Sequence, residues 1–290
     1  MKSKHKAILY ILSAALFFSL MNTFVRLAGD LPFIQKSFFR NLIAFFCAAA
    51  VMKKQHISPK WKEGSLKGLL MRSSFGLAGI LCNFYAVDHI PIADASMLNK
   101  LSPFFAILFS LIFLGERVTI VQWLLAMGAF AGSLLIIKPS MTNTDFFPAL
   151  IGLFGGMGAG AAYTAVRWLS GKGVKGPYVV FFFSAFSCIM TAPALIFDYH
   201  PMTVYQLAML LLAGGSAAAA QFSITAAYFN APAKEISVFD YSQVIFSAII
   251  GMIVFDQLPD VYSFLGYIII CLMAVIMFFY NNRSLGKCEK

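Results

Sequence analysis

Charged residues are scarce in this sequence, at 12% of 290 residues, whereas apolar residues make up 60%. Soluble globular domains carry about 25% charged residues. A fold of this length in water also needs far more polar surface than these residues can supply. The mean hydropathy of +0.80 points the same way. The scarcity of charge therefore excludes an ordinary soluble protein.

The sequence also lacks the patterns of the common catalytic and nucleotide-binding sites. It has no His-Glu-x-x-His zinc pair, no Walker A loop and no Gly-x-Ser-x-Gly elbow. Its four histidines fall in segments that we expect to be loops or tails. We therefore expect no enzyme activity, no cofactor and no metal site, so uphill transport would have to draw on a gradient or on exchange.

Cysteine is present at five positions but without any paired spacing. Four of these positions fall inside apolar segments: Cys47, Cys82, Cys188 and Cys271. Buried cysteine behaves as a small apolar residue. We expect these four to be reduced and the chain to form no disulfide.

What the sequence does contain is apolar runs of about 20 residues, the length that crosses a bilayer as a helix. The runs cover residues 7–28, 33–52, 68–87, 92–114, 120–138, 147–169, 176–197, 204–229, 235–255 and 261–281. They lack the strict alternation of barrel strands, and lipid leaves no partner for an open backbone. The sequence predicts an all-α, multi-pass integral membrane protein with ten transmembrane helices, the first one retained rather than cleaved as a signal peptide.

The positions of the basic residues predict the orientation of these spans. Sixteen of the 22 lysine and arginine residues fall on one side of the ten spans, and three, Arg26, Lys36 and Lys138, fall on the other. Basic residues accumulate on the cytoplasmic side of membrane proteins. We expect both termini in the cytoplasm, in the inner membrane of a cell. This topology also explains the net charge of +10 without nucleic-acid binding.

An internal repeat divides the chain into two halves. An offset of 141 residues superposes Thr23, Val25 and Arg26 on Thr164, Val166 and Arg167, and Pro91 and Ser96 on Pro232 and Ser237. Five spans per repeat is an odd number, so the second repeat must enter the membrane from the opposite side. We predict two inverted five-helix repeats, residues 1–140 and 141–290, which is transporter architecture.

Ionisable residues within the spans are the first candidates for function, because a charge in the bilayer costs at least about 2.5 kcal/mol. The 141-residue offset pairs Asn99-Lys100 in the fourth span with Asp240-Tyr241 in the ninth. Lys100 could attract a carboxylate or phosphate, and Asp240 an amine or a coupling proton. Alternatively, the two residues form a structural pair that locks the halves together, or Lys100 extends toward the membrane interface.

Arg40 and Arg72 form a second candidate set, since a guanidinium group binds carboxylate or phosphate through two parallel hydrogen bonds. Arg72, Gly76, Gly79 and Asn83 fall on one face of the third span. This small, polar face could line a cavity, or its glycines could serve close helix packing. Arg72 could also be an interfacial anchor.

Uncharged polar groups complete the candidate site. Gln221 lies on a comparable face of the eighth span, and Asn99 and Tyr241 flank the charged pair. Such groups orient a polar ligand, although they also join helices to one another.

Two motifs resemble the EamA-type transporters of the drug/metabolite transporter superfamily. They are Ser102-Pro103-Phe104-Phe105 and the Leu114-Gly115-Glu116 turn, which reads Phe255-Asp256-Gln257 in the second half. The resemblance implies ten helices in two repeats, with a cavity between spans one, three, four, six, eight and nine. It implies substrates such as amino acids, nucleoside-like compounds, vitamins or drugs.

The sequence thus favours a secondary active transporter that works by alternating access on a small polar metabolite, amino-acid-like or bearing an anionic group. The partners would be that substrate, the bilayer, and either a coupling proton or an exchanged substrate. A polytopic membrane subunit or receptor without transport activity is the alternative.

Overall fold

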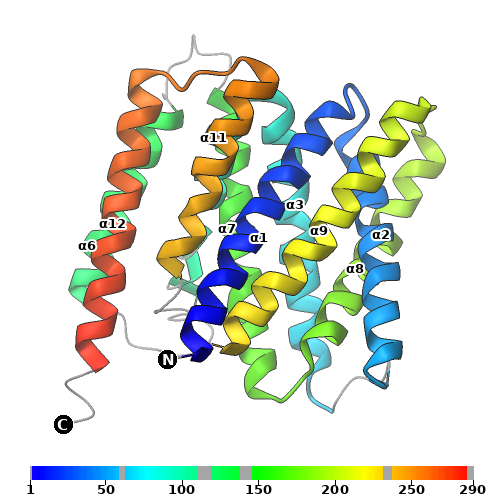
Figure 1. Cartoon of the computed structure of the whole chain (residues 1–290), viewed down its shortest axis with the longest axis horizontal. Coiled ribbons are helices and arrows are strands. Elements are labelled where there is room, and N and C mark those ends of the chain that lie inside the picture. The colour runs from blue at the N-terminus through cyan, green and yellow to red at the C-terminus, as the bar shows by residue number, and fades with distance from the viewer. Residues whose placement is uncertain are drawn as a thin grey trace.

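The computed structural model describes residues 2–58, 63–102, 104–106, 108–109, 119–137, 146–230 and 237–285. These residues fold into a bundle of roughly antiparallel helices (Figure 1). The helices are α1 Lys2–Leu27, α2 Phe33–Lys54, α3 Leu66–His89, α4 Ile92–Asn99, α6 Ile120–Ile137, α7 Phe146–Gly171, α8 Gly176–Phe197, α9 Val204–Asn230, the 3-10 helix η1 Ser237–Tyr241, α11 Ser242–Phe255 and α12 Val261–Leu285.

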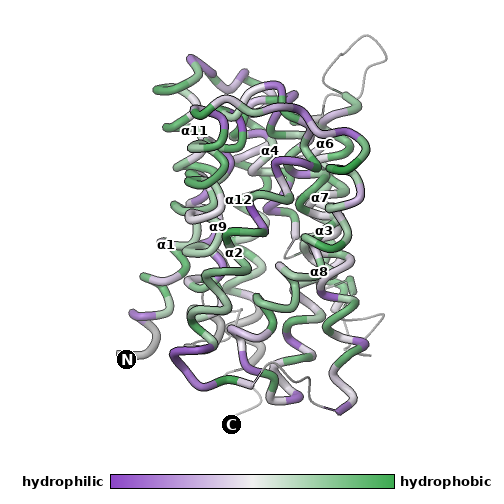
Figure 2. The backbone as a smooth tube through the Cα atoms, turned by 90° about the vertical axis from the view of Figure 1, so that its right-hand side faces the viewer, coloured by the Kyte–Doolittle hydropathy of each residue, from purple (hydrophilic) through white to green (hydrophobic). Residues whose placement is uncertain are grey.

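The described helices follow the apolar runs of the sequence. Seven of them are long and apolar enough to cross a membrane, and two shorter apolar helices cover 120–136 and 239–255. Hydrophilic residues gather toward the two ends of the bundle, with mainly hydrophobic residues between them (Figure 2). Large apolar side chains such as Leu124, Ile253 and Phe264 are exposed on the outside, where lipid tails would cover them. The protein is therefore a multi-pass, all-helical membrane protein.

Two of the predicted spans are not continuous α-helices. The sequence predicted one helix over 92–114, but α4 ends at Asn99, and Lys100 and Leu101 form a turn before helix resumes at Ser102. Pro103, outside the described residues, has no N–H to donate to the Asn99 carbonyl, which favours a break at this point. The predicted ninth span begins its described part as η1 and becomes α-helical only from Ser242.

Helices from the two halves of the chain pack against each other. α1 lies against α9, α3 against α7, α2 against α8 and α6 against α12, while α4 contacts both α7 and α11. α1 begins and α12 ends at the same end of the bundle (Figure 1). The Leu114-Gly115-Glu116 turn lies outside the described residues.

Glycine allows α3 and α7 to approach each other closely. A Cβ atom built on Gly158 would lie 2.9 Å from the Phe75 carbonyl oxygen, and one on Gly79 would lie 3.1 Å from the Gly155 carbonyl oxygen. Contacts this short leave no room for a side chain, as is usual where membrane helices associate through small residues. Helix packing therefore explains part of the small-residue face predicted on the third span.

Candidate functional site

A polar cavity of about 70 Å³ lies inside the bundle, between α1, α3 and α7. It is lined by Phe18, Met21 and Asn22 of α1, Arg40 of α2, Arg72, Gly76, Gly79, Ile80 and Asn83 of α3, Asn99 and Lys100 at the α4 break, Ala159, Ala162 and Tyr163 of α7, Gln221 of α9 and Gln243 of α11. Polar side chains from seven parts of the chain thus converge in the interior of an otherwise apolar bundle.

Six of the eight candidate residues identified in the sequence line this cavity: Arg40, Arg72, Asn83, Asn99, Lys100 and Gln221. Asp240 does not line the cavity itself but forms an ion pair with Lys100, which does. Tyr241 is buried among the residues of the main hydrophobic core and does not line the cavity.

Lys100 and Asp240 form a buried ion pair in which Nζ lies 2.6 Å from Oδ2. Both side chains are less than 5% exposed. The ammonium group also lies 5.8 Å from the centroid of the Phe18 ring. The second carboxylate oxygen of Asp240, Oδ1, is buried and has no hydrogen-bond partner among the residues that the structure describes. The carboxylate can therefore accept a further donor.

Arg40 and Arg72 reach the cavity from opposite ends of the bundle. α2 and α3 run antiparallel, and each arginine lies about 10 Å along its helix from the helix start, at a rise of 1.5 Å per residue. Their guanidinium carbons lie 5.9 Å and 4.2 Å from the centroid of the Phe183 ring. Phe183, on α8, is thus a shared contact surface for two cations.

A chain of serine hydroxyl groups holds the helices around the cavity. The Ser19 hydroxyl lies 3.0 Å from that of Ser247, which in turn lies 2.8 Å from that of Ser96. These bonds connect α1, α11 and α4. Within the cavity, the Asn83 amide donates to the Asn22 side-chain oxygen at 3.2 Å. The charged pair and the polar lining are therefore held by interhelical hydrogen bonds.

The sequence reasoning did not single out Asn22 and Tyr163, although both line the cavity. The signal that could have found them is the internal repeat, since 163 − 22 = 141. Cavity residues Phe18 and Ala159 have the same separation. These four residues are uncharged, so none of them indicates a functional site by itself. Only the 141-residue offset relates each residue to its equivalent in the other half of the chain.

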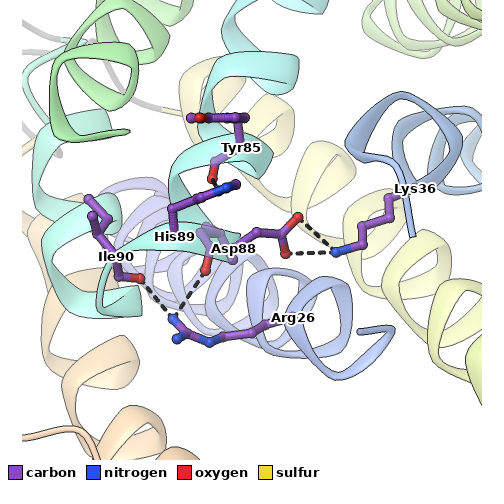
Figure 3. A network of polar contacts seen from close by, with 7 residues as sticks. Arg26, Lys36, Tyr85, Asp88, His89 and Ile90 are labelled. Atoms are coloured by element: carbon purple, nitrogen blue, oxygen red, sulfur yellow. Dashed lines mark hydrogen bonds and ion pairs between the residues drawn. The ribbon is translucent and has the colours of Figure 1, made fainter. Parts of the chain in front are cut away.

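A second polar cluster lies at the end of the bundle where α1 and α3 end and α2 begins (Figure 3). Lys36 Nζ lies 2.7 Å from both carboxylate oxygens of Asp88. Arg26 donates to the Val87 and Ile90 carbonyl oxygens at 3.1 and 2.8 Å. Its cation therefore complements the carbonyl end of α3, and the cluster ties three helices together.

Two further contacts join helices at this same end. Gln35, near the start of α2, exchanges two hydrogen bonds with the backbone of His200 in the loop before α9. The backbone N–H of Ile92 donates to Gln257 Oε1 at 3.2 Å. Gln257 stands where the family resemblance leads one to expect glutamate, and here it satisfies a donor at the N-terminus of α4.

Comparison with known proteins places this architecture among transporters. The model of the EamA-like transporter family matches residues 5–138. A pseudopaline exporter from Pseudomonas aeruginosa is 32% identical over 274 residues, which is 93% of this chain and 95% of that protein. A riboflavin transporter from Rhizobium johnstonii is 26% identical over 95% of this chain and 91% of its own length.

The fold is also present among solved structures. A crystal structure of a protein 17% identical to this chain superposes with a TM-score of 0.68 and covers 96% of this chain and 98% of its own. Identity at that level supports the fold alone. The family model and the relatives that match nearly the whole chain identify this protein as a member of the EamA-like transporter family of the drug/metabolite transporter superfamily, which transports small molecules rather than catalysing a reaction.

Proposed function

We propose that this protein is a secondary active carrier of a small polar metabolite that is amino-acid-like or bears an anionic group. The observation that carries the proposal is the cavity itself. The charged side chains of Arg40, Arg72 and Lys100 line it together with several amide side chains, inside an apolar bundle. Buried charges of this kind are costly in a membrane and are found mainly where they serve a pathway.

The carrier would consist of two inverted five-helix repeats, residues 1–140 and 141–290, which together give ten spans. The lining of the cavity supports this arrangement. Four pairs of lining residues are separated by 141 positions: Phe18 and Ala159, Met21 and Ala162, Asn22 and Tyr163, Ile80 and Gln221. A cavity lined by equivalent positions of two repeats lies on the axis that relates them.

Helix packing gives independent support for the two repeats. Under the 141-residue offset α1 corresponds to α7 and α3 to α9, so the α1–α9 contact and the α3–α7 contact are exchanged. One detail is equally symmetric. The Ser19 hydroxyl donates to the Gln243 carbonyl oxygen at 3.0 Å, and a Cβ on Gly160 would meet the Ser102 carbonyl oxygen at 2.7 Å. The two contacts are equivalent under the repeat, because Ser19 corresponds to Gly160 and Ser102 to Gln243, each 141 residues apart.

Both spans that carry the charged pair contain irregular helix beside the site. The turn at Lys100 and the junction between Tyr241 and Ser242 are 141 residues apart. Discontinuous helices expose backbone and polar side chains to a substrate at the membrane midplane. Lys100 lies in the turn after α4 and Asp240 lies in η1, where the ion pair can exchange partners with a zwitterion or with a proton.

Alternating access requires the helices to move, and the geometry supports such a step. Small-molecule pockets commonly hold about 300–1,000 Å³, whereas this cavity holds about 70 Å³. A substrate that needs a pocket of the usual size therefore fits only if the helices around the cavity move apart. The Lys36–Asp88 pair and Arg26 join α1, α2 and α3 at one end of the bundle (Figure 3), and we propose that this cluster is the gate on the side facing away from the cytoplasm, with both termini cytoplasmic.

Flux into proteoliposomes tests the carrier function. Purified protein would be reconstituted and assayed with amino acids, organic acids, nucleosides and vitamins, each with an imposed proton gradient, in exchange mode, and with neither. We expect saturable uptake or exchange of at least one anion-bearing solute, with the driving force revealed by the condition that supports it. A folded protein that moves no member of this panel under any condition would instead favour a subunit or receptor without transport activity.

A further inference from the structure

We propose that the cavity binds a solute with two negative charges, carried by two carboxylates or by a phosphate, and that Arg40 and Arg72 are the two residues that hold them. The inference rests on the proposed carrier function and narrows its substrate to dianions. It is based on the net charge of the described side chains at the cavity, which is positive.

Among the described residues, Arg40 is a buried cation without an anionic partner. It is 1% exposed. Its terminal nitrogen donates at 2.6 Å to the side-chain oxygen of its neighbour Asn41, which is a neutral group. Its Nε is buried and donates to no acceptor in the described part of the chain. In the described part of the chain the Arg40 side chain makes no ion pair, so most of its donors remain available to a ligand.

Arg72 is even less satisfied. It is 5% exposed and lines the cavity. Across the described residues it has no hydrogen bond and no ion pair, and its Nε is buried without an acceptor. Its guanidinium lies against the Phe183 ring at 4.2 Å. The ring gives a cation some stabilisation, but far less than removing a charge from water costs.

The remaining charges of the cavity cancel. Lys100 is neutralised by Asp240. Neither arginine meets a carboxylate among the described residues, so the two guanidinium groups leave a net charge of +2. A ligand that supplies two negative charges would complete two bidentate guanidinium pairs. A neutral or cationic ligand would leave both cations buried and unpaired, a state that proteins avoid.

The distance between the two cations suits one small ligand. Both guanidinium carbons lie within 6 Å of the same ring centroid, so at most about 10 Å separates them. Gly76, one turn beyond Arg72, provides the space that the Arg72 guanidinium occupies, since a Cβ on Gly76 would overlap its terminal nitrogen. The glycine therefore positions the arginine toward the cavity.

The test is ligand-induced thermal stabilisation of the purified protein in lipid nanodiscs. The probes are succinate, glutarate, citrate and glycerol 3-phosphate, with glutaramate, the monoamide of glutarate, and putrescine for comparison. A ligand that binds only the folded state raises the melting temperature. We expect the dianions to stabilise the protein and glutaramate to bind about ten- to a hundredfold more weakly than glutarate.

Variants separate a binding role from a structural one. Arg72→Gln and Gly76→Ala should each abolish stabilisation by dianions, with the melting temperature of the ligand-free protein unchanged or raised, because an unpaired buried charge is removed or displaced. Arg167→Gln at the exposed end of α7 and Gly215→Ala, where a Cβ meets nothing within 4 Å, are the matched controls and should behave like the unmodified protein.

Measuring the flux of the same solutes distinguishes the carrier proposal from the dianion-site proposal. Dianion binding without flux or exchange would overturn the carrier proposal and leave the binding site standing. Flux of uncharged or cationic solutes that persists in Arg72→Gln would overturn the dianion site and leave the carrier standing. If no dianion stabilises the protein and Arg72→Gln lowers its melting temperature, the arginines are structural and the inference is wrong.

Discussion

Lys100 and Asp240 lie 140 residues apart in sequence, yet their side chains meet at 2.6 Å inside the bundle. Lys100 lies in the turn that ends α4, and Asp240 lies in the 3-10 helix that begins the described part of its span. Helix ends carry backbone N–H and C=O groups that have no partner within the helix. Lys100 and Asp240 therefore have polar backbone groups nearby in addition to each other. The pair thus links two irregular segments across the centre of the protein.

Removal of either member of this pair should impair transport. Lys100→Ala and Asp240→Asn are each expected to reduce initial flux at least tenfold in proteoliposomes, because the site loses the charge that exchanges with substrate or proton. Leaving one charge unpaired costs about 3–5 kcal/mol, so the melting temperature should fall as well. Expression should be largely retained, as judged from the monodisperse fraction after solubilisation.

The double variant Lys100→Met with Asp240→Leu decides what the pair does. An apolar replacement of a buried ion pair is often neutral or stabilising. We expect the double variant to regain stability but not transport. Recovery of both stability and flux in the double variant would identify the pair as purely structural.

Asp88 should control access to the cavity from one side. Asp88→Asn leaves Lys36 without its carboxylate and weakens the contact between α2 and α3, which shifts the population toward the state open at that end. In a cysteine-free background, Ile80→Cys should react several-fold faster with a membrane-impermeant maleimide applied from that side. Asp198→Asn, in an exposed contact with His200, is the control, and equal rates in the two variants would exclude a gating role for Asp88.

Much of the fold was predictable from the apolar runs. A bilayer-length run in lipid has only the helix available to it, so nine of the predicted ranges agree with described helices to within a few residues at most of their ends. The break after Asn99 was not predicted, although Pro103 marks it, because the surrounding residues continue the apolar run. The irregular start of the ninth span has no proline and no comparable signal.

The charged residues of the candidate site could also be identified from the sequence, because an ionisable side chain within an apolar run is costly in a membrane and is seldom present without a function. What sequence could not supply is contact across helices. Phe183 lies in a run of three phenylalanines, and only the fold reveals that this ring faces Arg40 and Arg72. Gly79 illustrates the same limit, since it serves helix packing and also lines the cavity.

The contact between α3 and α7 should tolerate no side chain at Gly158. A Cβ there would lie 2.9 Å from the Phe75 carbonyl oxygen and 3.0 Å from the Gly79 Cα, both backbone atoms that cannot move alone. Gly158→Val is expected to destabilise the protein by about 1–3 kcal/mol, measured as a lower melting temperature in nanodiscs. Gly171→Ala, at the end of the same helix with open space around it, should leave the melting temperature unchanged.

Topology mapping tests the inverted arrangement through the number of spans. α1 begins and α12 ends at one end of the bundle (Figure 1), and Asp198, after α8, lies at the other end with Gln35 and His200. The excess of basic residues predicts that the first of these ends is cytoplasmic. Green fluorescent protein fused after Lys290 should therefore fluoresce, and Asp198→Cys should react with an impermeant maleimide in intact cells. An extracellular C-terminus would require an odd number of spans, which two equal five-helix repeats cannot give.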